Sequence, residues 1–297
     1  MRQERRAKPR RGIPLRAVTP NAVTALALCS GLTGIRFAIS GDWGAALACI
    51  GVAAVLDGLD GRIARLLRAQ TRFGAELDSL SDVIAFGVSP AVILHLWVLK
   101  DWPRFGWLFA LAFAVCMALR LARFNAGIDA EEQPHKSAGF LTGVPDPAGA
   151  GLMLLPILLW LASDGQWDWL RDYRLAAPWA AFSAFMLISS VATWSLGSLR
   201  VRRSVRLEAI AFVALLGGAL FTAPWETLSA IVLVYLAMTP LSMMSYARIK
   251  RQRRLAVAAR PPGPEPLGPV ASEGPVAGEG SPAPARRRRP PPNAPSA

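Results

Sequence analysis

Long apolar stretches separated by short charged segments run through the chain from about Asn21 to Tyr246. A helix needs roughly 20 mainly apolar residues to cross a bilayer, and several of these stretches reach or approach that length. The pattern therefore predicts an all-α protein, a polytopic transmembrane helical bundle of about eight spans. The expected spans are Asn21–Ser40, Trp43–Ala64, Leu80–Leu99, Phe105–Phe124, Val144–Ala162, Ala176–Leu196, Leu207–Ala223 and Thr227–Ala247.

Basic residues are distributed unevenly between the two sides of this predicted bundle. The tails and every second connection are rich in arginine, whereas the opposite side carries only Lys100, Arg104, Arg171 and Arg174, with Arg36 near its edge. Because positively charged segments stay in the cytoplasm, both termini are expected there. An even number of spans follows from this assignment.

Composition narrows the class of protein further. Lys and Arg number 33 against 20 Asp and Glu, while 53% of the residues are hydrophobic, so a nucleic-acid-binding protein and a soluble cytosolic enzyme both fit poorly. The basic start of the chain lacks the apolar core of a cleavable signal peptide. Cys29, Cys49 and Cys116 show no paired spacing, so neither a disulfide framework nor a zinc site is expected.

Three segments follow from these patterns. Residues 1–19 form a basic cytoplasmic N-terminal segment, residues 20–250 the transmembrane domain, and residues 251–297 a basic, Pro-rich tail. The tail has a composition that cannot bury a core, so we expect it to be disordered. Its run Arg286–Arg289 is either a solvated extension or a segment attracted to anionic lipid headgroups.

Four aspartates stand at the margins of the second and third apolar stretches. The first pair lies in Leu56-Asp57-Gly58-Leu59-Asp60-Gly61-Arg62-Ile63-Ala64-Arg65, and the second in Phe73-Gly74-Ala75-Glu76-Leu77-Asp78-Ser79-Leu80-Ser81-Asp82. Residues three or four apart share one face of a helix, so each pair shares a face. Because the connection is short, the two helices are predicted to be antiparallel neighbours with these faces opposed.

Ionised carboxylates at membrane depth are costly, which marks each of them as a functional candidate. Four that converge would repel one another unless they were neutralised, and carboxylate oxygens suit Mg²⁺, Mn²⁺ or Ca²⁺. The alternative is a set of interfacial ion pairs with Arg62, Arg65, Arg68 and Arg72, which would not need this spacing. The small residues Gly61, Ala64 and Gly74 leave room for a phosphorylated group near the backbone.

These residues complete a known pattern, Asp-x2-Asp-Gly-x2-Ala-Arg, eight residues, Gly-x3-Asp-x3-Asp, by which the chain resembles the CDP-alcohol phosphatidyltransferase family. The resemblance covers roughly the first six spans. It implies a homodimer, two bound Mg²⁺ or Mn²⁺ ions, and Asp82 as the proton acceptor. It also implies metal ligands Asp57, Asp60, Asp78 and Asp82, and a CDP-linked lipid on Asp57, Gly61, Ala64, Arg65, Gly74 and Asp78.

Three further stretches are similar to the membrane-embedded phosphatidylserine synthases of that family: 73–91, 119–125 and 140–149. The resemblance implies CDP-diacylglycerol as donor and L-serine as acceptor. Serine needs a cation for its carboxylate, and Arg120 and Arg123 are candidates for it or for a lipid phosphate, unless they only anchor a helix end at the membrane surface. The weaker candidates, chosen by position only, are Glu76, Asn125, Lys136 and Thr142.

Several alternatives remain open from the sequence. The same chemistry with glycerol 3-phosphate, inositol phosphate or choline would share all the motif residues. Intramembrane aspartates could also belong to a divalent-cation transporter, although transporters usually place them near the midplane in two related halves. A third alternative is a scaffold that only binds the nucleotide lipid. We expect an enzyme of the inner cell membrane with its active site facing the cytoplasm, and we assign no chemistry to the last two spans.

Overall fold

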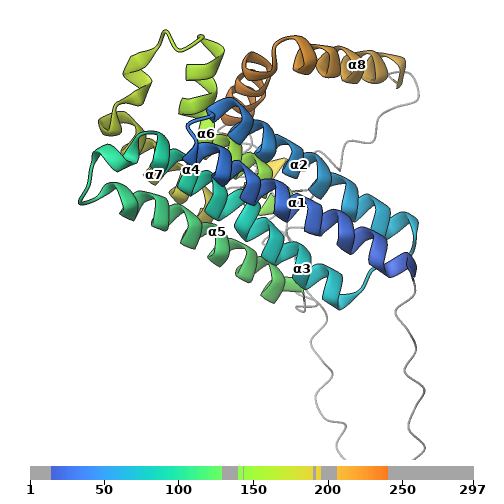
Figure 1. Ribbon diagram of the computed structural model, residues 1–297. Coiled ribbons are helices and arrows are strands. Elements are labelled where there is room, and N and C mark those ends of the chain that lie inside the picture. Colours follow the sequence, from blue (N-terminus) through green and yellow to red (C-terminus); the bar gives the residue numbers. More distant parts are fainter. Residues whose placement is uncertain (1–14, 129–139, 143, 190–191, 195–205, 240–297) are drawn as a thin grey trace, which may run out of the picture. The chain divides into compact units, whose positions relative to one another are not determined.

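Helices account for almost all of the structure, a computed structural model that describes residues 15–128, 140–142, 144–189, 192–194 and 206–239 (Figure 1). The α-helices are α1 (Leu15–Ile39), α2 (Trp43–Leu66), α3 (Arg72–Asp82), α4 (Ser89–Trp97), α5 (Gly106–Ile128), α6 (Asp146–Ala162), α7 (Tyr173–Ile188) and α8 (Arg206–Thr222). A further helix covers Pro224–Thr239. Short helical turns are η1 (Val83–Val88), η2 (Leu99–Asp101) and η4 (Asp168–Arg171).

Four helical segments are long and apolar enough to cross a membrane: Val18–Ile39, Trp43–Leu66, Arg72–Trp97 and Gly106–Ala126. Four shorter apolar helices, Asp146–Ala162, Tyr173–Ile188, Ile210–Thr222 and Pro224–Thr239, coincide with the other predicted spans. The helical membrane-protein fold is thus confirmed, while the span number and the side of the termini stay predictions. The third segment starts at Arg72 rather than at the predicted Leu80, and residues 1–14 and 251–297 lie outside the described part.

Large apolar side chains point outward from most of these helices. More than half of the side-chain surface is exposed at Leu26, Val55, Leu80, Leu108, Phe185, Phe212 and Phe221, the last of which is 94% exposed. Extended apolar surface of this kind is unfavourable in water but natural against lipid tails. The exposure therefore agrees with the apolar stretches of the sequence.

Two side-chain caps define where the aspartate-bearing helices begin. Asp42 accepts a hydrogen bond from the Ala45 backbone N–H at 2.9 Å and starts α2. Thr71 accepts one from the Gly74 N–H at 3.0 Å and starts α3. Such caps satisfy backbone donors that a helix start leaves free. Between the two helices, Arg68 takes a positive φ of 49°, which reverses the chain within a few residues.

The chain does not leave the helix after Asp82 but continues through η1, a π-helical segment, into α4. A π-helix bonds each N–H to the carbonyl five residues earlier and so holds more residues per turn than an α-helix. The segment is tightly packed, because a Cβ on Gly87 would lie 2.9 Å from Met117 Cγ, and one on Gly31 would lie 2.7 Å from Ala85 Cα. The η1 segment that follows Asp82 is therefore closely packed.

Helix α1 is the element on which the site is assembled, because it packs against α2, α3, η1 and α4 (Figure 1). Helices α2 and α3 both pack on α1, and their aspartate-bearing faces are opposed as predicted, because Asp57 and Asp60 of α2 come together with Asp78 of α3. Helix α5 contacts η1, α4 and α7 and completes the surroundings of the site.

One small antiparallel pair departs from the all-α prediction. Strand β1 (Phe140–Thr142) pairs with β2 (Ala192–Trp194), with Phe140 opposite Trp194. The predicted sixth span was expected to reach Leu196, but α7 ends at Ile188, where Ser189 adopts an extended conformation with ψ 136°. The hydrogen bonds between the strands satisfy backbone groups that helix bonds no longer serve.

Candidate active site

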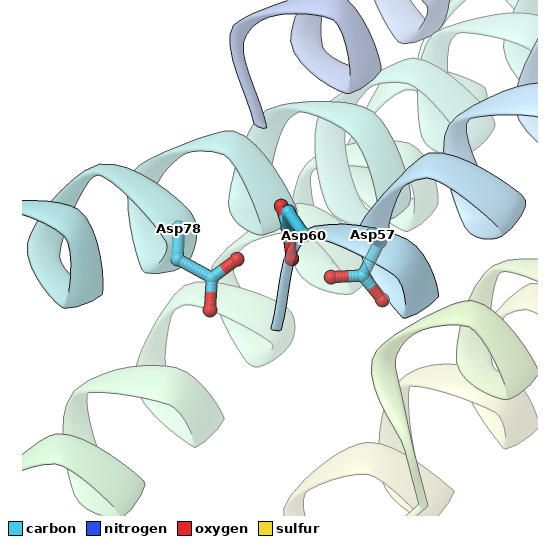
Figure 2. A group of neighbouring side chains, drawn as sticks. All are labelled: Asp57, Asp60 and Asp78. Carbon is cyan, nitrogen blue, oxygen red and sulfur yellow. The ribbon is translucent and has the colours of Figure 1, made fainter. Parts of the chain in front are cut away.

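Three carboxylates from two helices come together in one place. Asp57 and Asp60 of α2 and Asp78 of α3 each offer an oxygen within 4.8 Å of the others (Figure 2). Asp82, one turn beyond Asp78, interacts electrostatically with Asp57 and Asp78 and so belongs to the same group. The four aspartates that the spacing singled out thus converge, as the sequence predicted.

The surroundings of this cluster are short of positive charge. Arg62, Arg65, Arg68 and Arg72 are all exposed. Where the structure describes both partners, none of them forms an ion pair with the four aspartates, so the alternative of interfacial ion pairs is not supported. Asp60 is only 5% exposed. Buried carboxylates without a cation repel one another and lose hydration, which is unfavourable unless a ligand compensates.

The cluster fits a divalent cation. Its donors are all carboxylate oxygens, which hard cations such as Mg²⁺ and Mn²⁺ prefer. One of these atoms, Asp78 Oδ1, is buried and has no hydrogen-bond partner among the described residues. A buried acceptor without a partner is costly and is usually explained by a group that binds it. Asp57, Asp60, Asp78 and Asp82 are therefore suitable residues to hold metal.

Thr24 of α1 holds one of the aspartates in place. Its hydroxyl lies 2.7 Å from Asp60 Oδ2, inside the protein, and Ser81 Oγ donates a hydrogen bond to the Thr24 carbonyl at 3.2 Å. Helix α1 thereby contacts both aspartate-bearing segments through one residue. The sequence analysis did not single out Thr24, because its partner is 36 residues away and no local spacing signals the contact.

We expect Thr24→Val to weaken metal binding by about 10-fold, since partners that orient metal ligands typically account for 10- to 100-fold in affinity. Valine keeps the shape of the side chain but removes the hydrogen bond to Asp60. Mn²⁺ binding to the purified protein, measured by titration calorimetry, checks this. The matched control is Thr33→Val on the same helix, whose hydroxyl donates to the Cys29 carbonyl of its own helix. Equal affinities in the two variants would contradict a positioning role for Thr24.

The predicted lipid-binding residues on α2 lie on its open side. Within the described residues, a Cβ built on Gly61 would meet no atom within 4 Å apart from its own chain neighbours and helix backbone, so the backbone there is accessible to a ligand. Arg65 is exposed and donates a hydrogen bond from Nε to the Gly61 carbonyl at 2.9 Å. Ala64, which lies between these two residues in the sequence, is half-buried. Gly61, Ala64 and Arg65, which are expected to contact the CDP-linked lipid, therefore lie on one accessible turn beside the aspartates.

Gly74 is less open than the sequence suggested. A Cβ at this position would lie 2.9 Å from Asn21 Oδ1 and 3.2 Å from Thr71 Oγ1. The absence of a side chain thus allows α3 to approach α1, whatever it also does for a ligand. Close packing of membrane helices commonly requires small residues of this kind.

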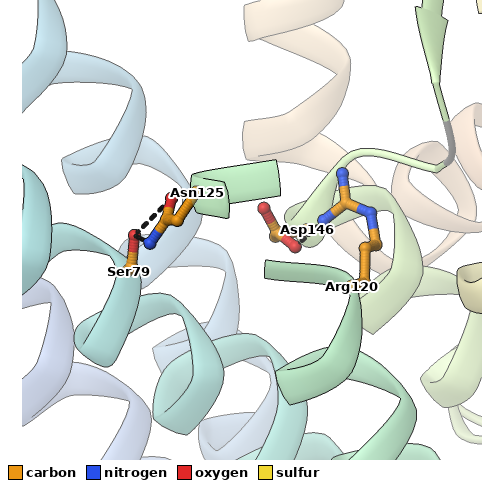
Figure 3. Close-up of polar contacts among 4 residues, drawn as sticks. All are labelled: Ser79, Arg120, Asn125 and Asp146. Atoms are coloured by element: carbon orange, nitrogen blue, oxygen red, sulfur yellow. Dashed lines mark hydrogen bonds and ion pairs between the residues drawn. The ribbon is translucent and has the colours of Figure 1, made fainter. Parts of the chain in front are cut away.

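The two arginines considered for the acceptor separate clearly in the structure. Arg120 is half-buried and forms an ion pair with Asp146, the first residue of α6 (Figure 3). Arg123 is exposed and donates from Nη1 to the Ile188 carbonyl at 3.2 Å, at the end of α7. Arg123 therefore caps a helix end, and Arg120 is the stronger candidate for a substrate. Lys136 lies outside the described residues.

Asp146 is a fifth carboxylate at the site, which sequence reasoning missed. It interacts electrostatically with Asp57, Asp78 and Asp82. A signal was available, because Asp146 is an acidic residue at the start of an apolar stretch, between Pro145 and Pro147. An ionised carboxylate at membrane depth is as costly here as at the other four positions, so Asp146 is a functional candidate for the same reason.

A second polar pair ties α5 to α3. Asn125 Nδ2 donates to Ser79 Oγ at 3.0 Å (Figure 3). Ser79 lies next to Asp78, and Asn125 lies on the same helix as Arg120. The bond therefore fixes the arginine-bearing helix relative to the aspartates. Asn125, a weak candidate for acceptor binding, has this structural partner instead.

Comparison with known proteins places the chain in a family. The sequence model described as CDP-alcohol phosphatidyltransferase matches residues 17–195. The chain belongs to the CDP-alcohol phosphatidyltransferase family. The matched range agrees with a resemblance over the first six predicted spans. A second model, CDP-alcohol phosphatidyltransferase 2, matches residues 205–240 and so extends the family likeness into the two later apolar stretches.

Curated relatives carry one shared name. Proteins named CDP-diacylglycerol–serine O-phosphatidyltransferase from Mycobacterium tuberculosis and Mycobacterium leprae are 39% and 38% identical to this phosphatidyltransferase. The alignments cover 80% of the chain in both cases, and 81% and 78% of the relatives. A protein of the same name from Helicobacter pylori is 31% identical over 73% of the chain and 87% of its own length.

Proposed function

We propose that this membrane enzyme transfers the phosphatidyl group of CDP-diacylglycerol to L-serine, which yields phosphatidylserine and CMP. The observation that carries the proposal is the convergence of Asp57, Asp60, Asp78 and Asp82 at the family's motif positions. The names of the relatives support serine as the acceptor. The same chemistry with glycerol 3-phosphate, inositol phosphate or choline is the alternative that experiment must separate.

The aspartates have distinct parts in this proposal. Asp57, Asp60, Asp78 and Asp82 would hold Mg²⁺ or Mn²⁺, with two ions expected. When bound, the cations would supply positive charge to the diphosphate oxygens of the donor lipid. Thr24 keeps the Asp60 carboxylate oriented toward the other three. Gly61, Ala64, Arg65 and Gly74, together with Asp57 and Asp78, line the expected position of the CDP-linked lipid, and Arg65 can reach a phosphate because it is exposed.

Asp82 acts as the general base in the proposed step. Its carboxylate accepts the proton of the serine hydroxyl, and the serine oxygen forms a bond to the lipid-side phosphorus. The bond between this phosphorus and the oxygen of the CMP phosphate breaks, and CMP leaves with the electron pair. Asp82 is suited to this role because it is the last aspartate of the motif and directly precedes the closely packed segment η1.

The setting of the reaction follows from charge and apolar length. We place the enzyme in the inner cell membrane with about eight spans, both termini and the active site in the cytoplasm, because arginines gather on the side of the aspartates. Residues 20–250 form the catalytic transmembrane domain in this proposal, with a basic segment before it and a basic tail after it. The homodimer that the family resemblance implies stays a prediction.

The test is release of CMP from CDP-diacylglycerol by the purified chain in detergent with Mn²⁺ or Mg²⁺. L-serine is compared with glycerol 3-phosphate, inositol phosphate and choline at equal concentrations. We expect release to depend on serine and phosphatidylserine to form in equal amount. Release with a different alcohol would retain the family chemistry and reject serine, whereas no release with any alcohol by folded protein would reject the enzyme assignment.

A further inference from the structure

We propose that Arg120 and Asp146 together recognise the acceptor as an α-amino acid, with Arg120 binding its carboxylate and Asp146 binding its ammonium group. The inference rests on the proposed function and adds a specificity site to it. Asp146 belongs to none of the residue sets that the motif or the sequence analysis assigned.

The first support is position. Arg120 of α5 and Asp146 of α6 are 13% and 18% exposed in their side chains, so both are partly buried yet reachable. Asp146 interacts electrostatically with three of the metal-site aspartates, Asp82 among them. An acceptor whose hydroxyl lies near Asp82 would therefore have its other polar groups close to this ion pair.

The second support is unused bonding capacity. A guanidinium group has five N–H donors, and a carboxylate accepts several hydrogen bonds. The hydrogen bond from Arg120 to Asp146 uses Nη1, whereas Arg120 Nε is buried and lacks a partner within the described residues. A buried donor without a partner is costly unless a ligand binds it. A carboxylate is the ligand that a guanidinium binds best.

The third support is the charge of the site. Asp146 places a negative charge beside Arg120, which is unfavourable for a phosphorylated acceptor. An amino acid carries no net charge, and its two opposite charges match the pair. Choline or ethanolamine would leave the buried Arg120 Nε without an acceptor, and a hydroxy acid would offer Asp146 no ammonium group. A buried polar group left unpaired in this way is a strong basis for rejecting an analogue.

Helix α5 is also held in register for this role. The bond between Asn125 and Ser79 fixes α5 against α3, the helix that carries Asp78 and Asp82. This bond helps to keep the Arg120 side of α5 in place relative to the aspartates. Precise placement of this kind is what discrimination between small substrates requires.

The experiment compares acceptors that each lack one group, in the purified full chain with CDP-diacylglycerol and Mn²⁺. L-serine has both charges, L-glycerate lacks the ammonium and ethanolamine lacks the carboxylate. We expect the wild-type kcat/KM for serine to exceed both others by at least about 100-fold. Asp146→Asn should lower the ratio of serine to glycerate by about 10- to 100-fold, because it removes a charge-assisted hydrogen bond.

Two further variants give the controls. Arg120→Lys keeps the charge but loses the planar fork, so the ratio of serine to ethanolamine should fall while the ratio of serine to glycerate changes less. Asp101→Asn makes the same chemical change at an exposed residue of η2, far along the chain from the site, and should change neither ratio. Unchanged ratios in folded Asp146→Asn would overturn the proposal and reduce the ion pair to a contact between helices.

A measurement without variants covers the case in which Asp146→Asn does not fold. L-alanine carries both charges but no reactive hydroxyl, so it should compete with serine in the wild-type enzyme at a concentration about 30-fold lower than propionate or ethylamine does. Equal inhibition by all three would overturn the assignment. If the wild type does not use serine at all, the proposed function fails first, which separates the two outcomes.

Discussion

Asp82→Asn lowers kcat for serine-dependent CMP release by about 10²- to 10⁴-fold, which is the expected result if its carboxylate accepts the serine proton. Asparagine has nearly the same shape but cannot accept a proton at neutral pH. The effect should fall on kcat more than on the KM for CDP-diacylglycerol. Steady-state kinetics of the purified variant, shown to be folded by its unfolding temperature, provide the measurement.

The control for this prediction separates a base from a metal ligand. If Asp82 only held a cation, a higher Mn²⁺ concentration would restore activity in Asp82→Asn. We expect no such recovery. Asp101→Asn, an exposed aspartate in η2, provides the matched change of charge and should keep wild-type kcat. Recovery at high Mn²⁺ would move the proton acceptor to another residue.

Removal of divalent cations has the second large effect. A chelator should reduce activity by at least about 1,000-fold, because a bound cation supplies several kcal/mol of charge stabilisation in such reactions. It should also lower the unfolding temperature. A ligand present at about 100 times its Kd stabilises the folded state by about 2.7 kcal/mol. Both effects should reverse on addition of Mg²⁺ or Mn²⁺ but not of a monovalent salt.

Asp78→Asn tests whether the aspartate cluster is the place where the metal acts. In the wild type, Asp78 Oδ1 is buried, and the part of the chain that the structure describes offers it no hydrogen-bond partner. Loss of its charge should therefore leave the metal-free protein at least as stable, because one of several mutually repelling groups is gone. The stabilisation by Mn²⁺ should shrink sharply. A full metal-dependent rise in unfolding temperature in this variant would place the cation elsewhere.

The sequence predicted the aspartate cluster well because its signal is local. Asp57 and Asp60 share a helix face by spacing alone, and so do Asp78 and Asp82. Charged residues within apolar stretches are also conspicuous. For the same reason the long helical segments were predicted well, with errors mainly at their ends, such as the early start at Arg72.

The remainder of the site depends on contacts between distant parts of the chain. Thr24 and Asp60 are separated by 36 residues, and Arg120 and Asp146 by 26. Threonine in an apolar helix has many ordinary uses, so nothing local distinguishes Thr24. The packing of both α2 and α3 on α1 was not predicted for a related reason: a short connection places two helices next to each other, but it does not show which other helix supports them.

The π-helical segment η1 makes the enzyme sensitive to chain length at one point. Because its turn holds a surplus residue, deletion of one residue between Val83 and Val88 would convert the turn to ordinary α-helix without breaking the segment. The residues within the turn would then take new orientations relative to Asp82, whereas the helix beyond it would keep roughly the same face. The contact between Gly87 and Met117 would be lost, although composition and hydrophobicity would hardly change. Homologous chains that work by the same geometry should therefore keep both the length of this segment and a small residue at the position of Gly87.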